Sequence, residues 1–293
     1  MTFRTRFAPS PTGPLHLGHA YSALLASDMA QAARGAFILR IEDIDKSRAR
    51  PAWEAQIYDD LAWLGLHWPE PVMRQSKRAA TYSAALDALW QRGLLYECSC
   101  TRADIAEALS APQEGAPLLG PDGLIYPGTC RRIHSLTKSD TRPTDAVLRL
   151  NMAEALRVTG HTDAQTMPLE FSESCHPQHI GTVRTYGPDI LRNIGDIVLS
   201  RRDMGTSYHL SVVLDDAAQG ITDVVRGADL FEATVIHVVL QKLLGLPTPR
   251  YHHHRLIRDD HGKRLAKRDD ARAISLFRSE GARAQDIRQM VGL

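Results

Sequence analysis

The sequence predicts an α/β fold built on a parallel sheet. Three observations predict it: short apolar runs alternate with segments of helical periodicity, glycine or proline stands at the junctions, and polar motifs directly follow the apolar runs. Two such runs, 3–8 and 37–41, have the length of strands, and the second is almost continuously apolar, as expected of a strand buried on both faces. Ligands bind such sheets beyond the carboxyl ends of the strands. The residues after 8 and after 41 are therefore the first candidates for a functional site.

The elements of the first half follow in order along the chain. The predicted elements are a strand at 3–8, a helix at 20–34 that Gly35 ends, a strand at 37–41, a helix at 51–64 that Gly65 ends, a helix at 79–92 and a strand at 94–96. Residues 1–97 therefore form the first half of the catalytic or binding domain.

The next segment breaks this rhythm. Residues 98–190 lack clean periodicity and include a stretch rich in proline and glycine, so we interpret them as an insertion with a small fold of its own. The α/β pattern then resumes, and its predicted elements are a strand at 194–199, a helix at 208–219, a strand at 221–225 and a helix at 230–244. Residues 191–247 thus form the second half of the domain, and 248–293 form a C-terminal piece with two short helical patterns.

Length and composition are those of an ordinary globular protein. The 293 residues are 43% hydrophobic and 24% charged, and the net charge of +1 provides no overall attraction to nucleic acid or membrane. The N-terminus lacks the residue order of a secretory signal, and no apolar run approaches a bilayer span. Four cysteines are too few for a disulfide scaffold. We expect a cytoplasmic protein with no membrane partner.

The stretch after the first strand has the pattern of a phosphate-binding loop. Prolines and a glycine follow the strand, and an apolar helical pattern starts just past Gly18. A strand, a tight loop and a helix start present backbone N–H groups and a helix dipole to phosphate. His16 and His19 flank Gly18, so both imidazoles can reach the same anion. At this point an ordinary loop with two surface histidines remains the alternative.

The insertion contains a group of cysteines. Cys98 and Cys100 are followed about thirty residues later by Cys130. Three thiolates grouped in this way favour zinc over buried thiols, because a tetrahedral zinc site can hold together a segment too small for its own core. From chemistry alone the fourth ligand is His134 or Cys175, since tyrosine is an unusual donor.

A basic loop lies in the C-terminal piece. Residues 262–268 read Gly-Lys-Arg-Leu-Ala-Lys-Arg. Such a loop is commonly a solvated turn, but its place after the second α/β half also suits a mobile cationic arm. Lys267 could then neutralise the charge that grows on phosphate oxygens in a transition state.

These motifs resemble those of a known enzyme family. The residues His16-Leu17-Gly18-His19 resemble the HIGH signature of class I aminoacyl-tRNA synthetases, and residues 264–268 resemble their KMSKS loop. In that loop Arg264 and Ala266 depart from the family's first lysine and its serine, whereas Lys267 is retained. Further similarity to glutamyl-tRNA synthetases covers residues 6–13, 40–45, 208–216 and 223–227. The likeness spans nearly the whole chain in the right order.

The resemblance implies a Rossmann-like catalytic domain with a zinc-containing insertion of the acceptor-binding type and a small helical C-terminal piece. The chain stops about 25 residues after the basic loop, so we expect no anticodon-binding domain. The chain is therefore most similar to the short paralogues, the glutamyl-Q tRNA(Asp) synthetases. Their zinc site implies the ligands Cys98, Cys100, Tyr126 and Cys130, with tyrosine in the fourth position.

The resemblance also implies the reaction. L-Glutamate is activated with ATP and magnesium to glutamyl-adenylate, and the glutamyl group then passes to the queuosine base in the anticodon of tRNA(Asp). The expected catalytic residues are His16, His19 and Lys267, and these residues with Gly18 bind ATP. We expect the enzyme to act as a monomer.

The glutamate site is implied in the same way, and the chemistry of the side chains agrees with it. Two carboxylates and one ammonium need fixed guanidinium groups and a carboxylate. The expected glutamate-binding residues are Arg6, Ala8, Ser10, Glu42, Tyr208 and Arg226.

Two other functions remain open on the sequence alone. The chain could be a truncated glutamyl-tRNA synthetase that charges tRNA(Glu), or a non-catalytic glutamate-binding relic of a synthetase. The relic would be expected to have lost the motif histidines, Glu42 or Lys267, and all of these are present. For the three consecutive histidines at 252–254, which lie on a predicted strand, we favour a structural role over a metal site.

Overall fold

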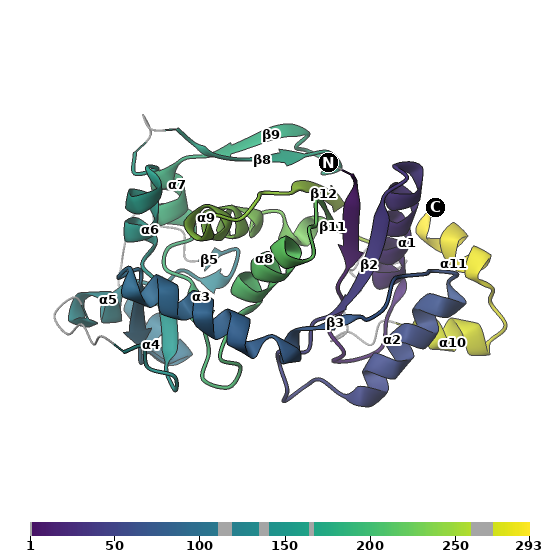
Figure 1. Ribbon diagram of the computed structural model, residues 1–293, viewed down its shortest axis with the longest axis horizontal. Coiled ribbons are helices and arrows are strands. Elements are labelled where there is room, and N and C mark those ends of the chain that lie inside the picture. Colours follow the sequence, from purple (N-terminus) through teal and green to yellow (C-terminus); the bar gives the residue numbers. More distant parts are fainter. Residues whose placement is uncertain (1, 111–118, 135–140, 164–166, 259–271) are drawn as a thin grey trace.

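The computed structural model describes residues 2–110, 119–134, 141–163, 167–258 and 272–293. Its central layer is a sheet in two parts (Figure 1). The first part has the parallel strands β1 (Arg4–Phe7), β2 (Ala36–Ile41) and β3 (Met73–Arg74). In the second, the order is β11 (Asp223–Gly227), β12 (Arg250–His254), β8 (Leu169–Glu173) and β9 (Gly181–Thr185). The two parts meet at β1 and β11, where the Thr222 amide donates to the Arg4 carbonyl at 3.0 Å.

The sheet separates two apolar cores, because successive side chains of a strand point to opposite faces. On β2, Ile38 packs in one core and Leu39 in the other, and on β11 Val224 and Val225 divide in the same way. All residues of β2 from Phe37 to Ile41 are buried. The prediction of a parallel sheet with a strand buried on both faces is therefore confirmed.

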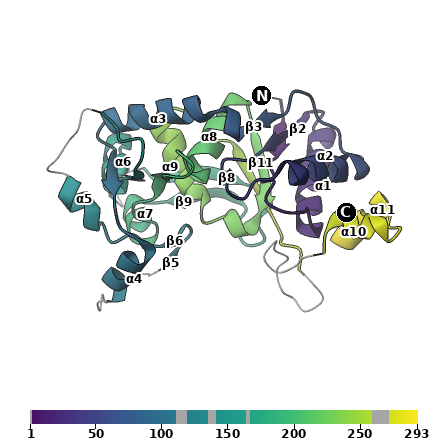
Figure 2. The same cartoon turned by 90° about the horizontal axis from the view of Figure 1, so that it is seen from below.

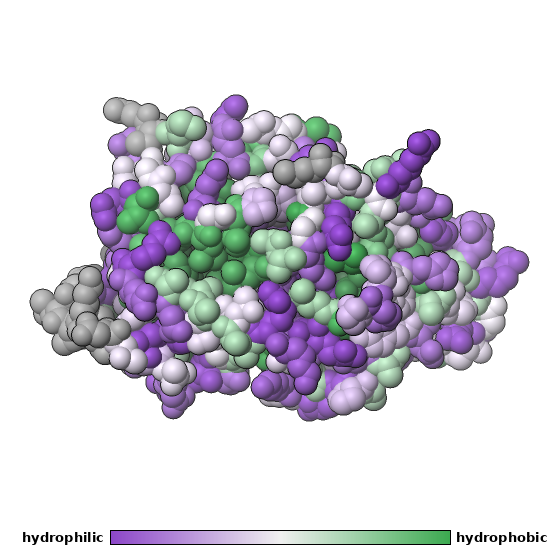
Figure 3. Space-filling model, viewed as in Figure 1, coloured by the Kyte–Doolittle hydropathy of each residue, from purple (hydrophilic) through white to green (hydrophobic). Residues whose placement is uncertain are grey.

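Helices cover both faces. One core lies under α1 (Leu17–Ala32), α2 (Pro51–Trp63), α10 (Ile274–Ser279) and α11 (Ala284–Val291). The other lies under α3 (Ala79–Gln91), α8 (Tyr208–Ala218) and α9 (Thr234–Leu244). Apolar side chains also gather on the surface over α9 and toward α3 (Figure 3). The C-terminal α11 packs on α1 (Figure 2). At this contact Arg288 donates to both carboxylate oxygens of Asp28 at 2.8 Å.

The insertion is tied to the rest of the fold by strands. A separate antiparallel sheet joins β4 (Leu95–Cys98), β7 (Val147–Leu150) and β10 (Val198–Ser200). The other elements of this region are α4 (Arg102–Ser110), β5 (Leu119–Gly120), β6 (Gly123–Leu124), α5 (Thr129–His134), α6 (Met152–Thr159) and α7 (Gly187–Asn193). The strand β8 of this region joins the central sheet beside β12.

Two details differ from the sequence-based expectations. The strands expected at 94–96 and 194–199 exist as β4 and β10, but they pair with β7 rather than with the parallel sheet. Periodicity reveals a strand and not its partner. In addition, α1 begins at Leu17, so Gly18 and His19 lie in its first turn rather than before it. Among the described residues, no helix combines the length and the apolarity needed to cross a membrane.

Candidate active site

The motif histidines cap the first helix of the fold. His16 is the N-cap of α1, and its Nδ1 accepts the Gly18 N–H at 3.1 Å. In return, the His16 N–H donates to Nδ1 of His19 at 3.2 Å. A ring nitrogen that accepts a hydrogen bond carries no proton, so each neutral imidazole carries its proton on Nε2. The cap therefore fixes both rings as Nε2–H donors.

Gly18 lies close against the ring of this cap. A Cβ on Gly18 would lie 3.0 Å from Cε1 and 3.1 Å from Nδ1 of the His16 ring, closer than ordinary van der Waals contact. A side chain here would make the His16 ring shift by a few tenths of an ångström relative to the amide whose hydrogen bond it accepts. The glycine thus keeps an imidazole at a helix N-terminus, where backbone N–H groups and the helix dipole favour an anion.

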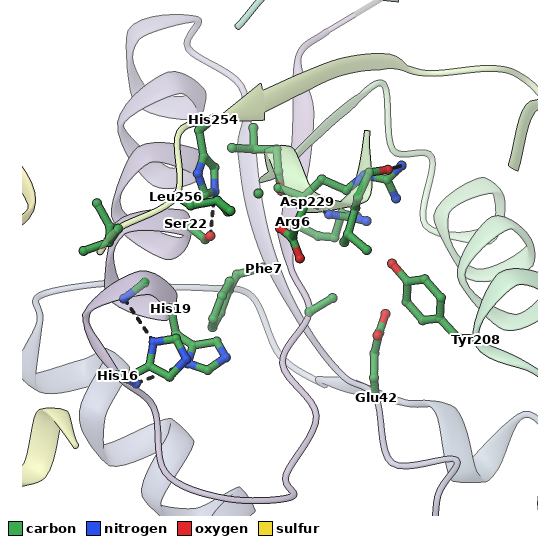
Figure 4. A pocket seen from close by; sticks show the side chains of 17 residues that line it. Arg6, Phe7, His16, His19, Ser22, Glu42, Tyr208, Asp229, His254 and Leu256 are labelled. Atoms are coloured by element: carbon green, nitrogen blue, oxygen red, sulfur yellow. Dashed lines mark hydrogen bonds between the residues drawn. The ribbon is translucent and has the colours of Figure 1, made fainter. Parts of the chain in front are cut away.

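A cavity of about 350 Å³ opens beside the cap, at the carboxyl ends of β1 and β11. Figure 4 shows the His16 and His19 rings at one end, Glu42 and Tyr208 at the other, and Arg6 between them. The residues expected from the sequence that line this cavity are Arg6, Ala8, His16, Gly18, His19, Glu42, Tyr208 and Arg226. Ser10 lines a neighbouring cavity, which Glu42 and Tyr208 also line. Lys267 lies outside the described residues.

Arg6 is held by a buried ion-pair network. Its Nε and Nη2 donate to the two carboxylate oxygens of Asp216 at 2.9 and 3.3 Å. Arg40, which is fully buried on β2, donates to Asp216 at 2.7 Å and to Glu42 at 3.1 Å. This network links β1, β2 and α8, so the fold itself orients Arg6 and Glu42.

The two carboxylates of this network differ in how far nearby guanidinium groups offset the cost of burying their charge. Burial alone would raise the pKa of Asp216, but Arg6 and Arg40 outweigh burial and hold that pKa below its ordinary value. The pKa of Glu42 is instead raised, because its burial outweighs the charges of Arg40 and Arg6 and the hydrogen bond that it accepts from Arg40. A bound ammonium group would supply further positive charge beside Glu42, so the site suits an amine-bearing ligand.

Arg226 enters the cavity from the end of β11 and is anchored at three of its nitrogens. It donates to Oγ1 of Thr234 at 2.7 Å, to Nε2 of His253 at 3.0 Å and to Nδ1 of His237 at 3.1 Å. Tyr208 lies nearby, and burial raises its pKa. The Tyr208 hydroxyl therefore stays protonated at neutral pH and can donate a hydrogen bond to an anion.

The cysteines of the insertion form a second cluster. The thiol sulfurs of Cys98, Cys100 and Cys130 all lie within 4.8 Å of one another. The Tyr126 hydroxyl lies 3.3 Å from the sulfur of Cys100, and that sulfur lies 3.4 Å from the sulfur of Cys130. Ligand sulfurs on a tetrahedral zinc stand about 3.8 Å apart, so the cluster has the size of a zinc site. Cys175 is exposed after β8 and does not belong to it.

The surroundings act differently on two thiols of this cluster, because burial raises the pKa of Cys100 to about 11 whereas that of Cys130 is lowered. Desolvation opposes the ionisation of Cys130, but hydrogen bonds from the Tyr126 hydroxyl and from Ser99 outweigh it and lower its pKa to about 6. Arg149 donates to the sulfur of Cys98 at 3.3 Å, and its guanidinium lies 3.9 Å from the centre of the Tyr126 ring. Three sulfurs and a phenol oxygen at this spacing are a possible tetrahedral donor set, so the residues present fit zinc.

Comparison with known proteins identifies the family. The family model described as "tRNA synthetases class I (E and Q), catalytic domain" matches residues 2–293. A curated relative from Rhodobacter capsulatus, named glutamyl-Q tRNA(Asp) synthetase, is 60% identical over 293 residues and covers 99% of each chain. The chain belongs to the glutamyl-Q tRNA(Asp) synthetases. It is therefore an enzyme, a ligase of the class I aminoacyl-tRNA synthetase type.

Other relatives agree with this family. A glutamyl-Q tRNA(Asp) synthetase from Albidiferax ferrireducens is 41% identical and covers 92% of this chain and 85% of its own. A solved glutamate tRNA ligase from Elizabethkingia meningosepticum, in complex with its amino acid, matches with a TM-score of 0.70 and 25% identity. This chain spans 61% of that longer chain. The Mycobacterium tuberculosis methionyl-tRNA synthetase, with a TM-score of 0.58 and 11% identity, shares the fold.

The structure also adds residues that the sequence analysis did not assign to the site. Asp229, Ser22 and His254 line the cavity, and the Ser22 hydroxyl lies 2.6 Å from Nε2 of His254 (Figure 4). For Arg40 the sequence did contain an indication, because a charged residue inside an otherwise apolar strand needs a buried partner of opposite charge. The partner, Asp216, stands 176 residues further along the chain. Nothing in the local sequence around Ser22 indicates its place in the site.

Zinc in the cysteine cluster of this synthetase is directly testable. We expect metal analysis of the purified enzyme to find about one zinc per chain, and Cys130→Ala to abolish it because three ligands hold zinc far more weakly than four. Cys175→Ala, which alters a cysteine outside the cluster, serves as the control and should retain zinc. An enzyme purified without stoichiometric zinc would refute the site.

Proposed function

We propose that this enzyme activates L-glutamate with ATP to glutamyl-adenylate and transfers the glutamyl group to the queuosine base in the anticodon of tRNA(Asp). One observation carries the activation step. A single cavity combines two oriented guanidinium groups and a carboxylate with a histidine-capped helix N-terminus. The first set suits glutamate and the second suits the phosphates of ATP, so we infer that the two reactants bind side by side.

Each ionised group of glutamate has a partner of opposite charge or a donor in this arrangement. Arg6 and Arg226 take the two carboxylates, because each guanidinium is held in a fixed direction by several protein contacts and still carries its charge into the cavity, which a lysine could not do. Glu42, whose compensation by Arg40 is incomplete, takes the ammonium. Tyr208 donates its hydroxyl, and the Ala8 backbone and Ser10 complete the wall between the two cavities.

Activation needs no nucleophile from the protein. The glutamate carboxylate oxygen forms a bond to the α-phosphorus of ATP, the bond from that phosphorus to the bridging oxygen breaks, and pyrophosphate leaves with the electron pair. His16 and His19 bind the phosphates through their Nε2–H groups, beside Gly18, with magnesium as the ion that accompanies ATP. Lys267 stabilises the charge on the phosphates during transfer. Catalysis is therefore positioning plus electrostatic stabilisation.

The acceptor half of the proposal rests mainly on the relatives, which are named for tRNA(Asp). The cavity next to the glutamate site supports it. That cavity shares Glu42 and Tyr208 with the glutamate site and continues to Arg201 and to Asp122 of the insertion. A nucleotide in this second cavity would meet the activated glutamate at the shared wall.

Lys267→Ala is expected to lower glutamate-dependent ATP–pyrophosphate exchange by about a hundredfold or more, because charge on the phosphates would lose a cationic partner in the transition state. Glutamate binding, measured by calorimetry, should persist because the glutamate partners lie on or directly after β1, β2 and β11 and on α8. Lys242→Ala, in the last turn of α9, is the control. Exchange that is unchanged in Lys267→Ala would remove Lys267 from the mechanism.

The acceptor is tested by incubating the enzyme with ATP, labelled glutamate and one purified tRNA at a time. We expect label on queuosine-containing tRNA(Asp) and none on tRNA(Glu). Charging of tRNA(Glu) alone would identify a truncated glutamyl-tRNA synthetase. Absence of glutamate-dependent exchange in the wild type would instead favour the non-catalytic relic.

A further inference from the structure

Arg226 begins a hydrogen-bonded chain whose direction is fixed by chemistry. A guanidinium is always protonated and only donates. The Arg226 Nε–H donates to Nε2 of His253, so His253 carries its proton on Nδ1. That nitrogen lies 2.5 Å from Oε2 of Glu173, a carboxylate on β8 with 3% exposure. The first arm therefore runs from arginine through one imidazole to a buried carboxylate.

A second arm leaves Arg226 through another nitrogen. Nη1 donates to Nδ1 of His237, which places the proton of that ring on Nε2. This nitrogen lies 3.1 Å from Nδ1 of His209, so His209 in turn carries its proton on Nε2. The His209 Nε2 lies 3.3 Å from Oδ1 of Asp122, in the β5–β6 turn of the insertion. This arm also ends on a carboxylate, the acceptor that its direction requires.

The chain works only with neutral imidazoles at its first step. Burial and the adjacent Arg226 charge lower the pKa of His237 well below its ordinary value. For His253, burial outweighs the hydrogen bond to Glu173 and lowers the pKa to about 4. Both rings therefore stay neutral at physiological pH and accept from Arg226.

We propose that Glu173 and Asp122, neither of which lines the glutamate cavity, are positioning residues that hold Arg226 in the orientation that binds a substrate carboxylate. Each carboxylate fixes the tautomer of the histidine that it contacts. If His253 changed tautomer, its Nε2–H would face the Nε–H of Arg226. If His209 changed tautomer, two N–H groups would face each other either between His209 and His237 or between His237 and Arg226. Arg226 would then lose a partner or be held less firmly. The proposal rests on the proposed function, because that function makes Arg226 a glutamate ligand.

A purely structural role for Glu173 is the alternative, since its Oε1 also accepts the backbone N–H groups of residues 174–176 and His253. Glu173→Gln separates the two roles. A glutamine can keep its carbonyl on those backbone groups, and it then presents its NH₂ to Nδ1 of His253. That ring nitrogen must accept, so the proton moves to Nε2 and opposes the Arg226 N–H.

The test combines a spectroscopic and a kinetic readout. In protein labelled with ¹⁵N-histidine, long-range ¹H–¹⁵N spectra of the wild type should show His253 protonated on Nδ1, and those of Glu173→Gln should show it protonated on Nε2. The KM for glutamate in pyrophosphate exchange should rise about tenfold or more in this variant while the KM for ATP stays unchanged. Glu170→Gln, on the same strand and in an exposed pair with Arg184, is the matched control.

The second arm keeps the proposal testable if Glu173→Gln fails to fold. The Asp122 side chain is 40% exposed, so substitutions there leave the core intact. Asp122→Ala should raise the KM for glutamate about threefold to tenfold, and Asp122→Asn, which keeps a carbonyl acceptor, should restore it.

Two results would overturn the proposal: a folded Glu173→Gln enzyme with an unchanged glutamate KM, or Asp122→Ala behaving as wild type. A wild-type enzyme without glutamate-dependent exchange would count against the proposed function instead. In that case the wild-type tautomers still test the chain, because a His253 protonated on Nε2 would contradict it.

Discussion

Asp216→Asn is expected to lower the free energy of unfolding by about 3–5 kcal/mol, the usual consequence of removing one partner from a buried ion pair. Asp216 is 6% exposed and accepts from both Arg6 and Arg40. Asparagine keeps the shape of the side chain but not the charge. Two buried guanidinium groups would then lose the carboxylate that both of them contact, and the NH₂ group of asparagine could not accept one of the two bonds that orient Arg6.

Urea unfolding followed by circular dichroism measures this loss. The folded pKa of Asp216 lies below its unfolded value, so the carboxylate stabilises the protein above the unfolded pKa, and that contribution is lost as the pH falls through the folded value. The difference between wild type and variant should therefore be constant at neutral pH and shrink in acid. Asp189→Asn, in an exposed pair on α7, is the control. A loss below about 1 kcal/mol for Asp216→Asn, which is typical of an exposed ion pair, would contradict the claim that this buried network stabilises the fold.

Arg226→Lys is expected to raise the KM for glutamate by about a hundredfold, or about 2.7 kcal/mol, while the KM for ATP changes little. Arg226 contacts Thr234, His253 and His237 through three different nitrogens and still reaches the cavity. A lysine has one nitrogen, so it cannot hold these partners and bind a carboxylate in a fixed direction.

The matched control is Arg184→Lys. Arg184 lies on β9 in an exposed ion pair with Glu170, so this substitution should leave both KM values as in the wild type. Pyrophosphate exchange at varied glutamate and at varied ATP measures both KM values for each variant and for the wild type. An Arg226→Lys enzyme with a wild-type glutamate KM would show that Arg226 does not bind the substrate.

The parts of the fold that could be predicted from the sequence are those set by local chemistry. The strand at β2 and the helix at Pro51 follow from residue order, helix-terminal preferences and apolar periodicity alone. The pairing of β4 with β7 could not be predicted in this way, because the residues that meet, such as Cys98 and Val147, are separated by the whole first part of the insertion.

The candidate site shows the same difference between features set by local sequence and features set by long-range contacts. Residues in compact motifs, such as His16, Glu42 and Arg226, were predicted together and line one cavity. The roles of their supports were not predicted. Asp216 lies in the motif at 208–216 and Glu173 in none, and both act through buried contacts with distant elements that the sequence does not reveal. For the fourth zinc ligand, chemical preference and family resemblance led to different predictions. Chemical preference pointed to His134 or Cys175, whereas family resemblance pointed to Tyr126, whose hydroxyl lies at the cysteine cluster.

The central claim is that glutamate is transferred to the queuosine base rather than to the terminal ribose. An anticodon stem-loop of tRNA(Asp) separates the two acceptors, because it carries the modified base and lacks the acceptor end of the tRNA. With ATP and labelled glutamate, we expect label on the stem-loop that contains queuosine and none on the same stem-loop with guanosine at that position. Label on intact tRNA but on neither stem-loop would contradict the account.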